Sequence, residues 1–133
     1  MTDSPRIEQL NSLICSKNGI WTRDNSDVHF DYSDGDAAEN NLQSIISTAT
    51  DLSSLSVELE QKYTDWTSEY HLSPQRSNIL RSLDITEFQT VLEVGSGCGG
   101  LTRYLGEQGL TVDAVEGSRR RTEIARLRCR NLP

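Results

Sequence analysis

The chain has 133 residues and a net charge of −7, with 25% charged and 35% hydrophobic residues, which fits a single globular domain. No run of 18 or more apolar residues occurs, so a transmembrane helix is excluded. The start of the chain lacks a signal-peptide pattern, and we expect a cytoplasmic protein without membrane contacts. Residues 1–70 carry a net charge of −9, which repels phosphate backbones and disfavours nucleic acid as a partner.

The first elements are short. Ile7, Leu10, Leu13 and Ile14 have the spacing of one helix face, which predicts a helix near the start of the chain. Residues 19–23 follow as a predicted short strand or extended segment.

Residues 24–70 predict turns and helices. Asp36 and Glu39 resemble a capping box, which opens a helix whose apolar residues between Leu42 and Ala49 share one face. A second helix is predicted over residues 53–63, where leucines recur at helical spacing. The aspartates near residues 31–36 do not have the spacing of an EF-hand, and we predict no metal site.

A further helix is predicted from Ser73 to Leu83. Ser73 is a favourable N-cap, and Pro74 is a favourable first helical residue. We expect Ile79, Leu80 and Leu83 to pack on the sheet that follows.

Residues 91–116 contain the most informative pattern. The apolar run 91–94 ends in the glycine-rich segment 95–100, a helical segment follows, and the β-branched run 111–115 ends at Glu116. This order predicts a βαβ unit that holds a nucleotide. Glycines allow positive φ angles and close backbone approach, and the amides of the next helix attract a phosphate or a carboxylate equally well.

One interpretation of the glycines is a dinucleotide site. Gly95, Gly97 and Gly100 spell G-x-G-x-x-G, and Glu116 follows about 20 residues on, as a ribose-binding acid would. This pattern indicates NAD or a flavin as the ligand.

The second interpretation starts from Glu93. With Gly95, Gly97 and Gly99 it spells E-x-G-x-G-x-G, which resembles motif I of the S-adenosylmethionine-dependent methyltransferases with a Rossmann-like fold. The acid favours this interpretation, because it would repel dinucleotide phosphates but suits the methionine ammonium of S-adenosyl-L-methionine. The resemblance implies an α/β protein with a truncated Rossmann-like fold: the first β-α-β-α of a parallel sheet, preceded by a mostly helical N-terminal region.

The resemblance also implies roles for single residues. Glu93 would lie near the methionine end of the cofactor, and Glu116 would accept hydrogen bonds from the ribose hydroxyls. Gly117 and Ser118 would lie near the adenine side of the ribose. The loop beneath the cofactor would consist of Gly95, Ser96, Gly97, Cys98 and Gly99. Two other interpretations stay open: Glu116 as a surface residue at a strand end, and Glu93 as a carboxylate satisfied by backbone amides.

The resemblance covers only part of a methyltransferase. We expect residues 1–70 to form the helical region and residues 71–133 the N-terminal part of the cofactor-binding domain. Two strands fit the chain, whereas such a fold has about seven, and no residue is a candidate for the catalytic or acceptor-binding positions. We therefore expect no turnover by this chain alone, an unpaired edge on its first strand, exposed apolar surface, and marginal stability or self-association.

Residues outside the glycine motif give further indications of what the chain would contact. In such folds the helix before the first strand often closes the cofactor pocket, so Tyr70, His71 or Arg76 would contact cofactor or substrate; otherwise this is a packing helix with a half-exposed His71. The run from residue 32 to residue 73 is similar to bacterial methyltransferases associated with cell-surface polysaccharides, which implies a sugar or small-molecule acceptor. Six arginines between residues 119 and 130 are interpreted as a solvated helix face rather than a nucleic-acid site.

The three cysteines show no pattern of a binding site. Cys15, Cys98 and Cys129 lie far apart, which predicts neither a zinc site nor a disulfide framework, and Cys98 is interpreted as a small residue that fits the loop. A non-catalytic nucleotide-binding or adaptor module, whose sheet a partner completes, remains a second class of function.

Overall fold

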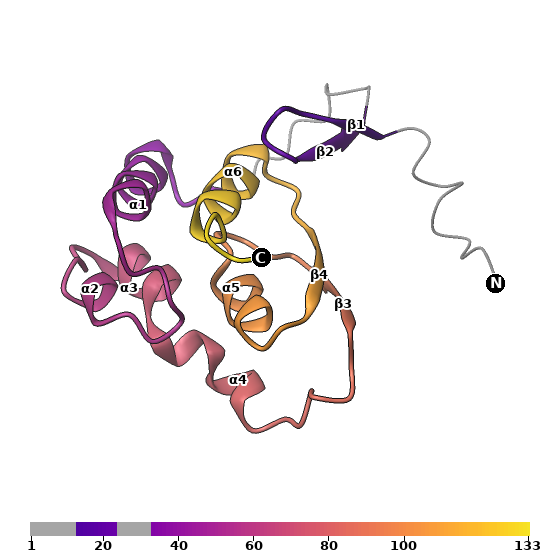
Figure 1. Ribbon diagram of the computed structural model, residues 1–133. Coiled ribbons are helices and arrows are strands. Elements are labelled where there is room, and N and C mark those ends of the chain that lie inside the picture. Colours follow the sequence, from indigo (N-terminus) through magenta and orange to yellow (C-terminus); the bar gives the residue numbers. More distant parts are fainter. Residues whose placement is uncertain (1–12, 24–32) are drawn as a thin grey trace. The chain divides into compact units, whose positions relative to one another are not determined.

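The computed structural model describes residues 13–23 and 33–133 (Figure 1). The chain divides into two compact units, residues 1–30 and residues 31–133. In the first unit, β1 (Leu13–Cys15) pairs antiparallel with β2 (Trp21–Arg23). The predicted extended segment is thereby confirmed for residues 21–23, whereas Gly19 lies in the turn before the strand.

The helix predicted at the start of the chain is wrong for two of its four residues. Leu13 and Ile14 lie in β1, and the other two, Ile7 and Leu10, lie outside the described residues. The reason is a turn: Gly19 has a φ of 74° and its N–H donates to the Ser16 carbonyl at 2.9 Å. This turn brings two extended runs together as a hairpin.

The second unit begins with α1 (Asp36–Thr48), which confirms the predicted helix. The predicted capping box is wrong, because Gly35 is the N-cap and no side chain caps the helix. Glu39 instead turns inward and accepts a hydrogen bond from the Ser33 hydroxyl at 3.0 Å. The apolar face is buried as expected. None of the helices in the described ranges has the length and apolar character needed to cross a bilayer.

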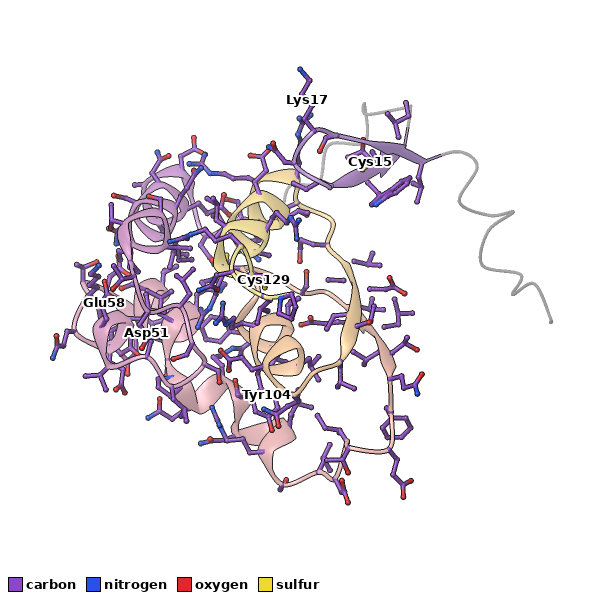
Figure 2. All side chains as sticks on the ribbon, in the orientation of Figure 1. Cys15, Lys17, Asp51, Glu58, Tyr104 and Cys129 are labelled. Carbon is purple, nitrogen blue, oxygen red and sulfur yellow. The ribbon has the colours of Figure 1, made fainter. Side chains whose placement is uncertain are left out.

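The helix predicted over residues 53–63 is much shorter. Only α2 (Val57–Glu60) forms, with Ser56 as its N-cap. Glu58 reaches back to the preceding loop, where its carboxylate accepts hydrogen bonds from the N–H groups of Thr50 and Asp51 (Figure 2). The Asp51 N–H foremost, then the Lys62 ammonium and the Thr50 hydroxyl, lower the pKa of Glu58 to about 2.

The helix α3 (Trp66–Leu72) was not predicted from the sequence. Asp65 and Ser68 form a capping box at its start. Next comes a 3₁₀ turn, η2 (Pro74–Ser77), with Ser73 as the predicted N-cap, and then α4 (Asn78–Arg81).

The sheet packing expected for this segment is confirmed only in part. Ile79 and Leu83 are exposed, so the expectation is wrong for them, whereas Leu80 faces a cavity beside the sheet. The physical reason is that α4 is only one turn long and ends at Arg81, so that Leu83 lies beyond the helix and does not share a helical face with Leu80.

The predicted βαβ unit is present. β3 (Thr90–Val94) and β4 (Thr111–Val115) pair in parallel, in register from Thr90 opposite Thr111 to Val94 opposite Val115. Between them runs α5 (Gly100–Glu107), and α6 (Arg119–Arg128) follows β4. The second unit is therefore a mixed α/β structure in which a small parallel sheet follows a mostly helical region.

The helices of the second unit lie on one side of this sheet. Figure 1 shows α5 and α6 beside the sheet and α1, α2 and α3 beyond them, in agreement with contacts between α5 and β4 and between α1 and α6. On the sheet, Leu92, Val94 and Val115 are exposed among the described residues. The predicted exposed apolar surface is thus confirmed, and it is unusual because parallel sheets are normally covered on both faces.

The arginines of α6 are a correction to the sequence analysis. Arg121 is only 4% exposed and lies between two carboxylates, with Arg121 Nη2 2.7 Å from Asp34 Oδ2 and Nε 3.2 Å from Glu39 Oε1. Acids from the start of the unit therefore neutralise a cation near its end. The predicted solvated helix face is correct for Arg119, which is exposed and pairs with Glu123 one turn further along α6.

Two further arginines bind helix ends. Arg128 is buried and donates to the carbonyl of His71 at 2.6 Å, near the end of α3. Arg130 donates to the carbonyls of Ile46 and Ala49 at the end of α1. Cations suit these positions because the last carbonyls of a helix lack intrahelical partners and carry a partial negative charge.

We predict that Arg121→Met lowers the free energy of unfolding by about 3 kcal/mol, because it removes the buried cation between Asp34 and Glu39 and leaves Glu39 with the ion pair to Arg120 Nε at 3.4 Å. Arg119→Met, two residues away on the same helix, should cost about 0.5 kcal/mol or less, since its ion pair is exposed. Urea unfolding followed by circular dichroism measures both. Equal losses would contradict a structural role for the buried arginine.

Candidate functional site

The glycine-rich loop joins β3 to α5 and is held against the end of β4. Gly95, Gly97 and Gly99 have φ angles of 80°, 56° and 82°, values that favour glycine over any other residue. The N–H groups of Gly95 and Ser96 both donate to the Val115 carbonyl, at 2.8 and 3.1 Å. The loop therefore turns sharply over the carboxyl ends of both strands, where ligands of open α/β sheets bind.

Glu116 is bound to this loop. Its Oε2 accepts a hydrogen bond from the Gly97 N–H at 2.8 Å, and its Oε1 accepts one from the Ser118 N–H at 2.9 Å. Each carboxylate oxygen has a second lone pair, so both can still accept a hydroxyl group. The acid predicted to bind ribose is thus held in one orientation beside the loop.

Glu93 lies at the end of β3 on the side of α5. Its Oε2 accepts a hydrogen bond from the Thr102 hydroxyl at 2.6 Å, so a side chain rather than backbone amides satisfies it. Burial raises the pKa of Glu93, Thr102 and the nearby Arg76 lower it, and Glu116 raises it further. Thr102 was not predicted as a site residue from the sequence, although it lies in the first turn of α5, next to the end of β3.

The third loop glycine explains the packing of the site. A Cβ atom on Gly99 would lie 2.8 Å from the Cα of Ala125 in α6, which is closer than atoms can approach without a shift. On Gly100 it would meet only the His71 carbonyl at 3.5 Å and the Arg76 Cβ at 3.9 Å, which are ordinary contacts. The fold therefore needs glycine at position 99 and tolerates a side chain at position 100.

The remaining predicted site residues have structural roles. Cys98 is buried in the core with Leu72 and Ile124, and burial raises its pKa to about 12. It therefore holds a neutral, unreactive thiol below the loop. Ser118 accepts a hydrogen bond from the Arg121 N–H as the N-cap of α6, and Gly117 is exposed beside it.

α3 and η2 lie against the start of α5. His71 is buried, which corrects the half-exposed position expected for it, and its Nε2 lies 2.8 Å from Asp34 Oδ2. Burial lowers the pKa of His71 although Asp34 opposes that shift. Arg76 lies over the Tyr70 ring, with its Cζ 4.1 Å from the ring centroid. Of the three residues expected near a ligand, the structure leaves Tyr70 and Arg76 accessible and places His71 in the interior.

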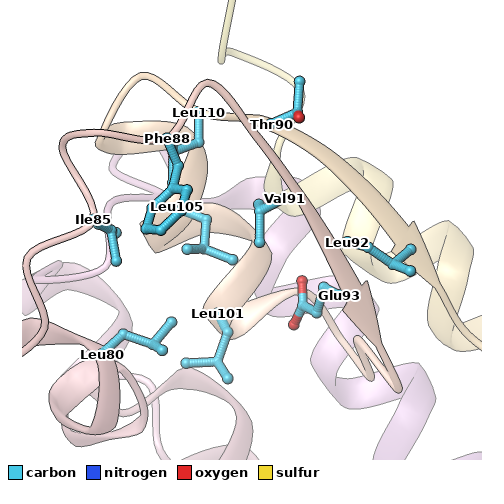
Figure 3. A pocket seen from close by; sticks show the side chains of 10 residues that line it. All are labelled: Leu80, Ile85, Phe88, Thr90, Val91, Leu92, Glu93, Leu101, Leu105 and Leu110. Carbon is cyan, nitrogen blue, oxygen red and sulfur yellow. The ribbon is translucent and has the colours of Figure 1, made fainter. Parts of the chain in front are cut away.

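An apolar cavity of about 350 Å³ lies beside β3 (Figure 3). Leu80, Val91 and Leu101 line it from α4, β3 and α5, and Glu93 supplies its one carboxylate. In Figure 3, Val91 and Glu93 point from β3 toward α5. The Glu93 carboxylate therefore faces a cavity whose other lining residues are mainly apolar.

No family model, no curated protein and no solved structure matches the chain. Within residues 13–23 and 33–133, no group of three or more histidine, cysteine, aspartate or glutamate side chains is placed to hold a metal ion. The function is therefore inferred from the residues of the loop and the two acids.

We predict that Gly99→Ala lowers the free energy of unfolding by about 2 kcal/mol or more, because the new Cβ combines an unfavourable positive φ with overlap against α6. Gly100→Ala is the matched control and should be neutral or slightly stabilising, since alanine is the better helix former. Denaturant unfolding of both variants tests this, and a larger loss for Gly100→Ala would contradict the packing described.

Proposed function

We propose that this chain binds S-adenosyl-L-methionine and forms the N-terminal part of a methyltransferase with a Rossmann-like fold. The observation that carries the proposal is the Glu116 carboxylate, which the N–H groups of Gly97 and Ser118 hold beside the glycine loop. A fixed acid at this position fits a ribose diol, because each oxygen keeps a lone pair for one hydroxyl.

Each end of the cofactor would meet a complementary group. Glu93 would pair with the methionine ammonium, and the first amides of α5, which have no intrahelical acceptor, would face the methionine carboxylate. Arg76, whose charge acts on Glu93, adds a cation on the same side. The loop backbone from Gly95 to Gly99 would lie beneath the ligand, and Gly117 and Ser118 would lie near the adenine.

The loop supports this cofactor over NAD. In G-x-G-x-x-G the third glycine allows close packing between helix and strand, but here Gly100 has ordinary contacts. The steric requirement falls on Gly99, the third glycine of E-x-G-x-G-x-G. In addition, the negative charge of Glu93 would repel a pyrophosphate.

Methyl transfer needs more structure than these two strands provide. The reaction depends on holding the methyl group in line with an acceptor atom, which is mainly positioning. We propose that further strands, encoded with this chain or supplied by a partner, pair along β3, cover the cavity and complete an acceptor site for a small molecule or a sugar. The free thiols of Cys15, Cys98 and Cys129 suit the reducing cytoplasm that we propose as the location.

The bare sheet face favours a second candidate, a non-catalytic adaptor. Leu92, Val94 and Val115 present an apolar surface next to an open strand edge, which a partner strand or helix could cover. In that case the glycine loop would bind a nucleotide without any methyl transfer.

Calorimetric titration with S-adenosylhomocysteine tests the cofactor assignment. We expect saturable binding that Glu116→Ala weakens about 10- to 100-fold, because hydrogen bonds to a charged group are lost. Glu123→Ala, which removes an exposed acid from α6, is the matched control and should leave the affinity unchanged.

The same titration separates the alternatives. Binding of NAD with no binding of S-adenosylhomocysteine would overturn the cofactor assignment. Binding of S-adenosylhomocysteine without methyl transfer, even after the partner strands are supplied, would favour the adaptor.

The raised pKa of Glu93 predicts a pH dependence of binding. The ligand ammonium pairs with the ionised carboxylate, so S-adenosylhomocysteine affinity should fall as the pH drops through the raised pKa, above the ordinary value of 4.5. Glu93→Gln should bind more weakly at neutral pH and lose this part of the pH dependence. Titrations between pH 4 and 8 measure it, and an unchanged profile in the variant would exclude Glu93 from the ammonium site.

A further inference from the structure

A stack of three side chains extends from the glycine loop along α3. The Arg76 guanidinium lies 4.1 Å above the Tyr70 ring, and the Tyr70 ring is stacked on Trp66 with centroids 5.0 Å apart and an interplanar angle of 22°. We call these three residues the aromatic stack. Trp66 is 69% exposed at its outer end.

The stack begins at the candidate cofactor site. The Arg76 Cβ would lie 3.9 Å from a Cβ on Gly100, the first residue of α5, and the Arg76 charge lowers the pKa of Glu93. Trp66 lies two stacking steps away from Arg76. A molecule bound on the outer face of Trp66 would therefore lie at the opposite end of the stack from Arg76 and the start of α5.

The charge around Trp66 is acidic. Asp65, the N-cap of α3, and Glu69 in its first turn are both exposed, and the sequence has no lysine or arginine between Lys62 and Arg76. Tryptophan presents the most negative ring face of the aromatic residues, so a cation on it gains from the ring and from both carboxylates. An anionic group would be repelled there, and a neutral ring would gain nothing from the acids.

Single exposed aromatic residues are common on protein surfaces and need no explanation. Trp66 differs because its ring is stacked on Tyr70, whose ring also contacts the Arg76 guanidinium, and because its exposed neighbours in the sequence include two acids and no base. These features together match the surfaces that recognise alkylammonium groups.

We propose that the outer face of Trp66 binds a cationic group of the methyl acceptor, so that the acceptor is an amine- or ammonium-bearing small molecule. The assignment of this ligand as an acceptor rests on the proposed function, whereas the binding of a cation at Trp66 does not. Glu69 and Asp65 supply charge complementarity, and Trp66 supplies the contact surface.

The test uses NMR spectra of the ¹⁵N-labelled chain, in which the indole N–H signals of Trp66 and Trp21 are separate reporters. Choline is the probe, 3,3-dimethylbutan-1-ol is its neutral isostere, and sodium chloride keeps the ionic strength constant. We expect choline to shift the Trp66 signal saturably, about two- to fivefold more tightly than the isostere. Trp21, which is also exposed but lies two residues from Arg23, should show no such preference.

Two variants complete the test. Glu69→Gln should weaken choline binding, and Trp66→Leu should abolish the choline-dependent shifts of the α3 amides while leaving the circular dichroism spectrum unchanged. Equal binding of choline and isostere, an equal response at Trp21, or no saturable shift would overturn the proposal. Titration of the same samples with S-adenosylhomocysteine reports separately on the cofactor site, so the two proposals fail independently.

Discussion

The second unit depends on a buried ion network between its beginning and its end. Asp34 and Glu39 lie at the start of the unit, and Arg121 lies on its last helix. Neither acid could be buried alone, because an unpaired charge out of water costs several kcal/mol. The pairing therefore holds α1 against α6.

The network also supports the candidate site. His71 binds Asp34 through its ring and accepts a hydrogen bond from Arg128 through its carbonyl, which places the end of α3 against the start of α5. Through these contacts Arg76 and Tyr70 reach the side of the glycine loop. The loop itself needs little beyond its own strands, since Val115 and Glu116 accept the N–H groups that hold it. A local motif thus carries the proposed cofactor contacts, whereas long-range ion pairs position the residues around it.

The same arrangement explains which surfaces remain open. The helices that the buried arginines hold together, α1, α3 and α6, lie on one side of the small sheet. The apolar side chains of Leu92, Val94 and Val115 on the sheet therefore stay uncovered. A parallel sheet is stable when helices cover both faces and further strands pair with its edges. The bare face and the cavity along β3 are therefore the surfaces that the proposed additional strands would cover.

Local sequence determined the βαβ unit and the position of its two acids. The order of strand, glycines, helix and strand depends on backbone requirements that residues 91–116 carry by themselves, and Gly95, Gly97 and Gly99 have the positive φ angles that such a turn needs. The start of α1 was predicted at the right residue although no side chain caps it, whereas the capping box of Asp65 and Ser68, a local signal, was not recognised. Glu39 was read as part of a cap, but a distant arginine holds it in the interior.

Only the tertiary structure decided the roles of the charged residues. A run of arginines looks like a solvated face in sequence, because the partners of Arg121 lie more than eighty positions away. The burial of His71, the packing of Gly99 against Ala125 and the stacking of Arg76 on Tyr70 likewise depend on which helices meet. Periodicity and capping act over a few residues, whereas desolvation and ion pairing depend on the folded neighbourhood; the motif could therefore be predicted from this sequence, and its surroundings could not.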